Sequence, residues 1–154
     1  MKFTIKKTRD ELGPDLARRA ARAKNPKKGL EAMGLAVVSM ATRAFTQAAL
    51  RPSTWSPLKA ATIKAKKRLG YGSKPLVRSG ALAHSPRVVK VTSKTVSVGS
   101  DRNVGGKSLA AIHQLGTKVI PARPVWPFDQ AGRITAAGVR NVKAAARAAL
   151  KLER

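Results

Sequence analysis

The sequence predicts a small α+β protein in which helices flank an antiparallel sheet. Helical periodicity predicts a long helix over residues 30–50 and a C-terminal helix over 130–152. Between them in the sequence, the pattern predicts a β-hairpin at 87–100 and a further strand near 118–122. With 154 residues, the chain has the length of one domain. We divide it into a basic N-terminal arm, residues 1–28, and a single α+β domain, residues 29–154.

The arm begins with a short alternating stretch that places Phe3 and Ile5 on one side of a strand. Pro14 suits the first turn of a helix, which a thin stripe of Leu and Ala continues to Ala23. Lys24–Gly29 interrupts this periodicity and is predicted to be a linker.

The stretch from Leu30 to Leu50 has the clearest helical pattern, and Val38 and Phe45 widen its apolar stripe enough to predict burial on two sides. Gly34 costs about 1 kcal/mol in a helix interior. It marks either a close contact or a tolerated weak point. The apolar residues that recur at steps of three and four are Leu30, Met33, Val37, Met40, Ala41, Ala44 and Ala48.

A basic helix is predicted from Leu58 to Leu69, because Ser56 can cap it and Pro57 suits its first position. Its cations can contact DNA phosphates or an acidic partner, although a solvated helix face has the same composition. The residues proposed for this contact are Lys59, Lys64, Lys66, Lys67 and Arg68.

In the hairpin, a turn at Ser93-Lys94 pairs Val91 with Val96 and Val89 with Val98. Residues 101–107 are predicted to form a polar loop. Ser108 caps a short helix, Leu109 to Leu115, that Gly116 ends, and a strand follows at 118–122.

Pro121, Pro124 and Pro127 remove backbone donors, so this segment is predicted to be an edge strand or an exposed bend. We expect this corner and the helix before it to form the hub of the subunit. Arg123, between two prolines, is either a donor fork preset for a neighbouring subunit or an ordinary surface arginine.

The composition indicates a partner. The net charge is +25, from 32 Lys and Arg against 7 Asp and Glu, which predicts a polyanion or acidic protein neighbours. The hydrophobic content of 43% is rich in alanine and aromatic residues make up 4%, so the core buries little area per residue. We therefore expect copies or partners to complete the stability of the subunit.

The sequence carries no enzyme signature that we recognise. There is no cysteine, which excludes disulfides and thiolate chemistry. Gly105-Gly106-Lys107-Ser108 departs from a phosphate-binding loop, since Asp101 stands where that motif requires glycine. His84 and His113 are too far apart in sequence to suggest a metal site. We predict no catalytic residue, cofactor, metal or small-molecule substrate, and no signal peptide or membrane span.

Several blocks together resemble the virion morphogenesis proteins of Mu-like phages, also described as tail-completion or head–tail joining proteins. They are Trp55-Ser-Pro-Leu58, Leu69-Gly-Tyr71-Gly, Pro75-Leu-Val-Arg78-Ser-Gly80-Ala-Leu82, Val96 to Ser100, Ala110-Ala-Ile-His-Gln-Leu-Gly116 and Ile120-Pro-Ala-Arg-Pro124. The resemblance covers roughly residues 30 to 128 and leaves the arm and the last helix outside. Leu115 and Val125-Trp126 depart from the family pattern but stay apolar.

The resemblance implies a structural neck protein of a long-tailed phage. Such a protein forms a homo-oligomeric ring that completes the tail or joins head to tail. Its partners are the head connector on the portal side and tail-terminator or tail-tube proteins, with contact to packaged DNA possible. It is assembled in the host cytoplasm and located in the virion. The residues that we assign to the subunit interface are Trp55, Arg78, His113, Arg123 and Trp126.

The alternative comes from another class: a basic nucleic-acid-binding protein of ribosomal or chromatin type. The high positive charge and the alanine-rich helices support it.

Overall fold

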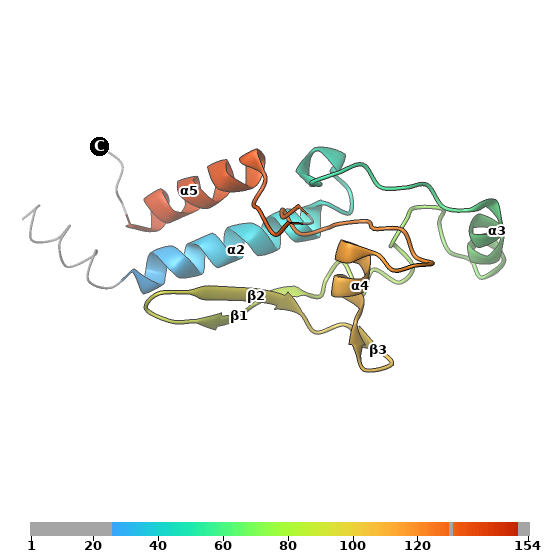
Figure 1. The fold of residues 1–154 in the computed structure, drawn as a ribbon, viewed down its shortest axis with the longest axis horizontal. Helices are drawn as coiled ribbons and strands as arrows, with labels where there is room; N and C mark the ends of the chain where they lie inside the picture. The colour runs from blue at the N-terminus through green and yellow to red at the C-terminus, as the bar shows by residue number, and fades with distance from the viewer. Residues whose placement is uncertain (1–25, 130, 151–154) are drawn as a thin grey trace, which may run out of the picture.

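The structure is a computed structural model that describes residues 26–129 and 131–150. The strand predicted in the arm, the arm helix and the last residues of the C-terminal helix lie outside this part of the chain. Two helices, α2 (Lys27–Arg43) and α5 (Ala136–Leu150), lie side by side, and a hairpin of β1 (Pro86–Val91) and β2 (Val96–Ser100) packs against α2 (Figure 1). The predicted α+β class is confirmed, with α2 as the middle layer between α5 and the hairpin.

Helix α2 is packed on two sides as predicted, but it ends at Arg43 and not at Leu50. The side chain of Arg51 donates from Nε to the carbonyl of Ala44 at 2.7 Å, and from Nη2 to that of Phe45 at 3.3 Å. These bonds hold the chain in a turn after α2, and a short 3₁₀ turn, η1 (Ala48–Leu50), follows. The apolar pattern of the sequence continues past the end of the helix, because Ala44 and Phe45 are buried although they lie outside it.

The hairpin has the predicted turn but not the predicted register. Val91 pairs with Val96, whereas Val98 pairs with Val88 because Val89 forms a β-bulge. The bulge turns Val88 toward α2, where it lies close to Gly34, and leaves Val89 63% exposed. At the turn, the hydroxyl of Thr92 accepts from the backbone N–H groups of residues 94 and 95, which compensates for an unfavourable turn sequence.

The strand predicted at 118–122 is absent from the described residues. The hydroxyl of Thr117 accepts from the N–H groups of Val119 and Ile120 and closes a turn there. Instead, the predicted loop at 101–107 contains a small hairpin of β3 (Asn103–Val104) and β4 (Lys107–Ser108). Gly105 and Gly106 form its tight turn with φ of 55° and 73°, values that favour glycine.

The first residues of the other three helices agree with the sequence prediction only for α4. Helix α3 (Ala60–Arg68) starts two residues after the predicted Leu58 and has no side-chain cap. Helix α4 (Leu109–Leu115) has the predicted bounds, with the hydroxyl of Ser108 accepting from the N–H of Ala111. The last helix begins at Ala136 and not at residue 130, because the chain before it first turns at Asp129–Arg133 and forms a bridge between Phe128 and Ile134.

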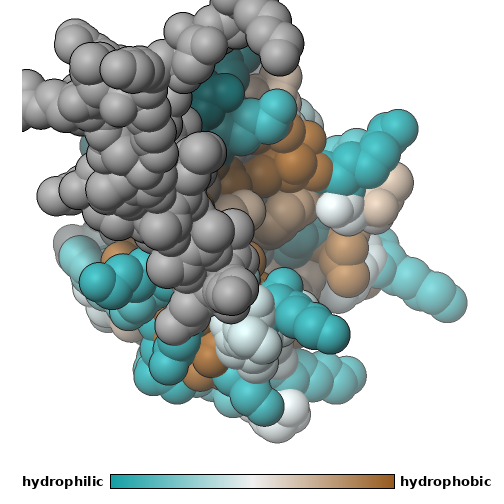
Figure 2. Space-filling view, turned by 90° about the vertical axis from the view of Figure 1, so that its left-hand side faces the viewer, coloured by the Kyte–Doolittle hydropathy of each residue, from teal (hydrophilic) through white to brown (hydrophobic). Residues whose placement is uncertain are grey.

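The core is small and lies where α2, the segments around the two tryptophans and α5 meet. Considerable apolar surface remains outside it, since Val119 is 82% exposed and Leu115 63%. At the end of the molecule where α2 begins, apolar residues gather in one area among long hydrophilic side chains (Figure 2). The buried apolar residues are Val37, Met40, Ala41, Ala44, Phe45, Trp55, Leu82, Ala110, Val125, Trp126 and Val142.

Gly34 is the point of closest approach between α2 and the hairpin. A Cβ atom there would lie 2.5 Å from Cγ2 of Val96 and 3.1 Å from Cγ2 of Val88. Both are short, β-branched side chains, so the hairpin backbone would have to move away. We predict that Gly34→Ala lowers the free energy of unfolding by about 1–3 kcal/mol in chemical denaturation, although alanine favours helices.

The matched control is Gly29→Ala in the same helix. The new Cβ would meet Cδ1 of Leu150 at 2.9 Å, the end of a flexible side chain that can rotate. We expect little change there, or a gain of up to about 1 kcal/mol. A Gly34→Ala protein as stable as this control would contradict the close packing of α2 on the hairpin.

Candidate functional site

The segment Arg123–Pro127 runs through the interior of the subunit. All five residues are buried, so the prediction of an edge strand or exposed bend is wrong. The prolines explain this placement, since a buried segment with few N–H donors has few donors to satisfy. The groups that remain must still find partners, because an unpaired buried N–H costs about 1–3 kcal/mol.

Gln114, near the end of α4, satisfies most of these groups. Its Oε1 accepts from the backbone N–H groups of both Val125 and Trp126 at 3.1 Å, and its Nε2 donates to the carbonyl of Phe128 at 2.9 Å. In addition, the N–H of Arg123 donates to the carbonyl of His113 at 2.7 Å. One helical turn thus fixes the whole proline segment, and we call these contacts the Gln114 clasp.

The same segment holds the loop that follows α2. Nε1 of Trp55 donates to the carbonyl of Pro124 at 2.8 Å. Arg123 donates from Nε to the carbonyl of Ser56 at 2.8 Å and from Nη2 to that of Pro57 at 3.0 Å. These bonds keep residues 56 and 57 extended, so Ser56 and Pro57 do not begin α3 as the sequence suggested.

Trp55 is packed between two side chains from the segment that follows α2. The ring of Phe45 meets it edge-on, with centroids 5.8 Å apart, and the guanidinium of Arg51 lies 3.8 Å from its centroid. The predicted hub around the corner and α4 therefore extends to the start of the α3 segment.

The five predicted interface residues fall into two groups. Trp55, Arg123 and Trp126 are buried and bonded or packed within their own chain, with Arg123 only 7% exposed. Arg78 is exposed and lies 4.9 Å from the ring centroid of Tyr71, and His113 is half-buried. Contact of any of them with a neighbouring subunit stays a prediction, but the donors of Arg123 toward Ser56 and Pro57 are already used.

The cations of the predicted basic helix also fall into two groups, exposed and inward-facing. Lys59, Lys64, Lys67 and Arg68 are exposed around α3, which lies at one end of the long axis of the molecule (Figure 1). Lys66 instead turns inward, and its ammonium donates to the carbonyls of Lys74 and Val77 at 2.6 and 2.7 Å. Lys66 therefore anchors α3 to the loop after it, while the other four are available to a partner.

A groove of about 390 Å³ lies between α3, the 76–82 loop and α4. Leu58, Leu76, Leu82 and Leu109 give it apolar walls, and Arg78, Arg102, Arg123 and Lys66 give it positive charge. None of the described residues that line it is acidic. Three of the predicted interface residues, Arg78, His113 and Arg123, thus meet at this groove, together with Lys66 of the predicted DNA contact.

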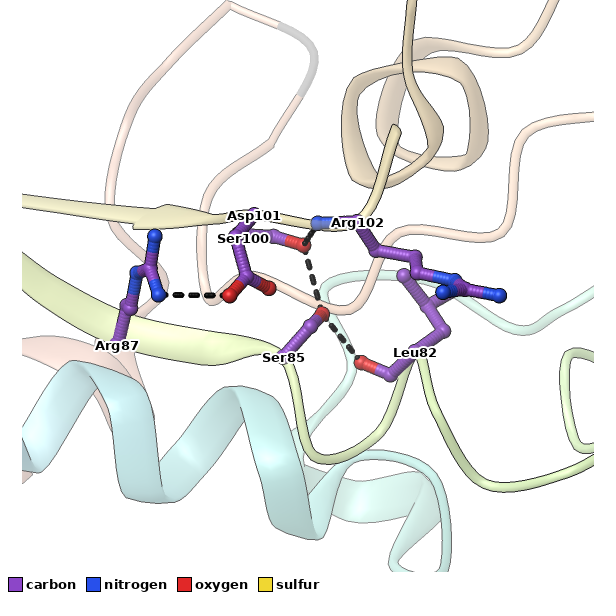
Figure 3. A network of polar contacts seen from close by, with 6 residues as sticks. All are labelled: Leu82, Ser85, Arg87, Ser100, Asp101 and Arg102. Carbon is purple, nitrogen blue, oxygen red and sulfur yellow. Dashed lines mark hydrogen bonds and ion pairs between the residues drawn. The ribbon is translucent and has the colours of Figure 1, made fainter. Parts of the chain in front are cut away.

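Arg102 was not singled out from the sequence, where it is one cation in a polar loop. Its neighbour Asp101 is held by Arg87 at 2.6 Å, and its own side chain points away from Asp101, alongside Leu82 (Figure 3). Its backbone N–H donates to the hydroxyl of Ser100. Because Ser85 gives its one hydroxyl hydrogen to the carbonyl of Leu82, Ser100 donates to Ser85, and this chain of bonds ties Arg102 to the 76–82 loop.

His113 lines the groove and is half-buried there. Burial lowers the pKa of His113, and the nearby Arg123 guanidinium lowers it further. Nδ1 of its ring is buried and has no hydrogen-bond partner among the described residues. Among the described residues, no carboxylate lines the groove beside His113.

Residues 26–129 and 131–150 contain no metal site, phosphate-binding loop or membrane-spanning helix that we can recognise. No group of three His, Asp or Glu side chains there could hold a metal ion. The Gly105-Gly106-Lys107-Ser108 stretch is a hairpin turn that leads into α4. In the described chain, no helix has both the length and the apolar character needed to cross a bilayer.

Comparison with known proteins gives one match. A family model described as the phage virion morphogenesis family matches residues 9–154. This match includes most of the arm and the last helix, which the motif resemblance had left outside. No curated protein and no solved structure matches the chain.

The Gln114 clasp gives a test of the buried segment. Gln114→Met keeps the length of the side chain but leaves the N–H groups of Val125 and Trp126 without an acceptor. We predict a loss of about 2–4 kcal/mol in the free energy of unfolding, measured by chemical denaturation. Gln47→Met is the control, because Gln47 is exposed and its side-chain oxygen accepts from the side chain of Arg43. Equal stability of the two variants would show that the clasp contributes nothing.

Proposed function

The chain belongs to the phage virion morphogenesis family, and we propose that it is a structural neck protein of a long-tailed phage. In this proposal, identical copies form a ring that completes the tail or joins head to tail. Its partners are the head connector on the portal side and tail-terminator or tail-tube proteins on the other. The role is structural and not catalytic, in a virion assembled in the host cytoplasm.

The observation that carries the ring proposal is the unfinished surface of the subunit. Its main sheet has only two strands, so β1 and β2 each keep one edge without a strand partner in the described chain. Unpaired edges are templates for pairing with another chain. A neighbouring copy would supply what this sheet lacks.

Exposed apolar side chains support the same proposal. Leu115 and Val119 project from rigid structure, since α4 ends at Gly116 and Thr117 fixes the turn that carries Val119. A fully buried Val or Leu side chain contributes about 1.5–3 kcal/mol relative to an exposed one. A ring contact that covers these side chains would recover that energy.

We predict that the purified protein forms a discrete oligomer, or a monomer that assembles only on isolated connectors or tails. Val119→Glu should raise the concentration needed for assembly by roughly tenfold or more, as judged by mass photometry. Lys118→Ala makes the same change in net charge at the next residue without removing apolar surface, and should assemble normally. A protein that stays monomeric and ignores both connectors and tails would overturn the ring proposal.

A second candidate function is contact with DNA, which α3 favours. None of the residues of α3 is buried, its cations other than Lys66 are exposed, and no acid lies on the helix. In a neck protein, the polyanion that such a surface would meet is the packaged DNA. This contact is compatible with the ring, and family membership favours it over a ribosomal or chromatin protein.

The DNA contact is tested by reversing Lys64, Lys67 and Arg68 to Glu together. We predict weaker binding to duplex DNA in fluorescence anisotropy. The slope of log K against log salt should become shallower by about 0.9 for each phosphate that the protein no longer neutralises. Reversal of Arg140, Lys143 and Arg147, exposed on α5, changes the net charge equally and is the control. Equally weak binding by both variants would assign the binding to total charge and not to α3.

A further inference from the structure

The groove between α3, the 76–82 loop and α4 is suited to a ligand that is both apolar and acidic. Arg78 and Arg102 have exposed guanidinium groups on its rim, and neither is paired with a carboxylate of the described chain. Between them lie the apolar walls formed by leucines. A segment that carries carboxylates beside leucine or a similar side chain would satisfy both parts at once.

Residues 10–16 of this chain have this composition. Three of its seven acidic residues, Asp10, Glu11 and Asp15, fall within six positions, and Leu12 and Leu16 alternate with them. By contrast, Asp101 and Asp129 are already paired with Arg87 and Arg133. We propose that residues 10–16 of one subunit dock in the groove of the next subunit, so that the arm links neighbours in the ring. This inference rests on the proposed ring.

The placement of the groove favours a neighbouring subunit over the same chain. Helix α2 begins at one end of the long axis, and α3, which contributes Thr62 and Lys66 to the groove, lies beyond its other end (Figure 1). Helix α2 alone, with 17 residues, is about 26 Å long. The ten residues from Leu16 to Pro26 reach about 15 Å as a helix, and at most about 36 Å when fully extended. An arm that contains the predicted helix therefore cannot reach its own groove.

An arm at one end and a groove at the other also make a head-to-tail contact. Such a contact uses two different surfaces of each copy, and it closes into a ring when the rotation between copies allows. Each subunit then gives one arm and receives one.

The test uses the absence of cysteine from the natural chain. One tagged chain carries Leu12→Cys, and a second, with a different tag, carries Ser79→Cys on the exposed rim of the groove. Docking holds the two thiols at an effective concentration in the millimolar range. At micromolar protein, mixed disulfides should therefore form roughly 100-fold faster than with Ser93→Cys, an exposed serine at the hairpin turn, outside both strands and the groove, that serves as the control.

A charge exchange gives a second measurement on the full-length chain. Arg78→Glu with Arg102→Glu should reduce the oligomer, and adding Asp10→Arg with Glu11→Arg to that chain should restore it. An oligomer that forms while Ser79→Cys crosslinks no faster than the control would overturn arm docking and leave the ring standing. A chain that neither assembles nor crosslinks would overturn both. If the exchange of Arg78 and Arg102 abolishes only the binding of connector or tail proteins, the groove belongs to those partners and arm docking is wrong.

Discussion

The fold depends on the burial of a segment that cannot join a sheet. Pro124 and Pro127 remove two of the donors that a strand would need, yet Arg123–Pro127 crosses the interior. Its polar groups are satisfied by side chains and by one turn of α4, chiefly through Gln114. Because the partners come from α4 and from the loop after α2, the segment fixes elements that are otherwise far apart in the sequence.

This constraint separates a rigid interior from surfaces that the subunit does not itself use. Trp55 and Arg123 tie the loop before α3 to the core, and Lys66 ties α3 to the loop that follows it. The helix itself gains almost no burial from these bonds, so its cations stay outside. The result is an α3 that is held in position but is covered by little of its own chain, and the groove lies between it and α4.

The sequence predicts what local chemistry determines and fails where distant contacts decide. Ser108 and Gly116 delimit α4 by themselves, and the apolar stripe of α2 shows two buried sides. The bulge at Val89 follows from the fit of Val88 and Val96 against Gly34, which no alternation pattern contains. Arg123 illustrates the same limit: its chemistry as a donor fork was predictable, but its acceptors turned out to be carbonyls of residues 56 and 57.

With a net charge of +25, identical copies repel one another, and charges at the contact itself must overcome that repulsion. At physiological salt the Debye length is about 8 Å, so distant charges on neighbouring subunits are largely screened and only charges at the contact matter. Across such a contact, acidic residues placed against Arg78 and Arg102 replace repulsion by attraction, and three of the seven acids of the chain lie together at residues 10–15 of the otherwise basic arm. The cations of α3 stay outside that pairing and keep their charge for a polyanion. One strongly basic sequence can therefore serve both an interface between copies and a surface for DNA, because the two use different cations.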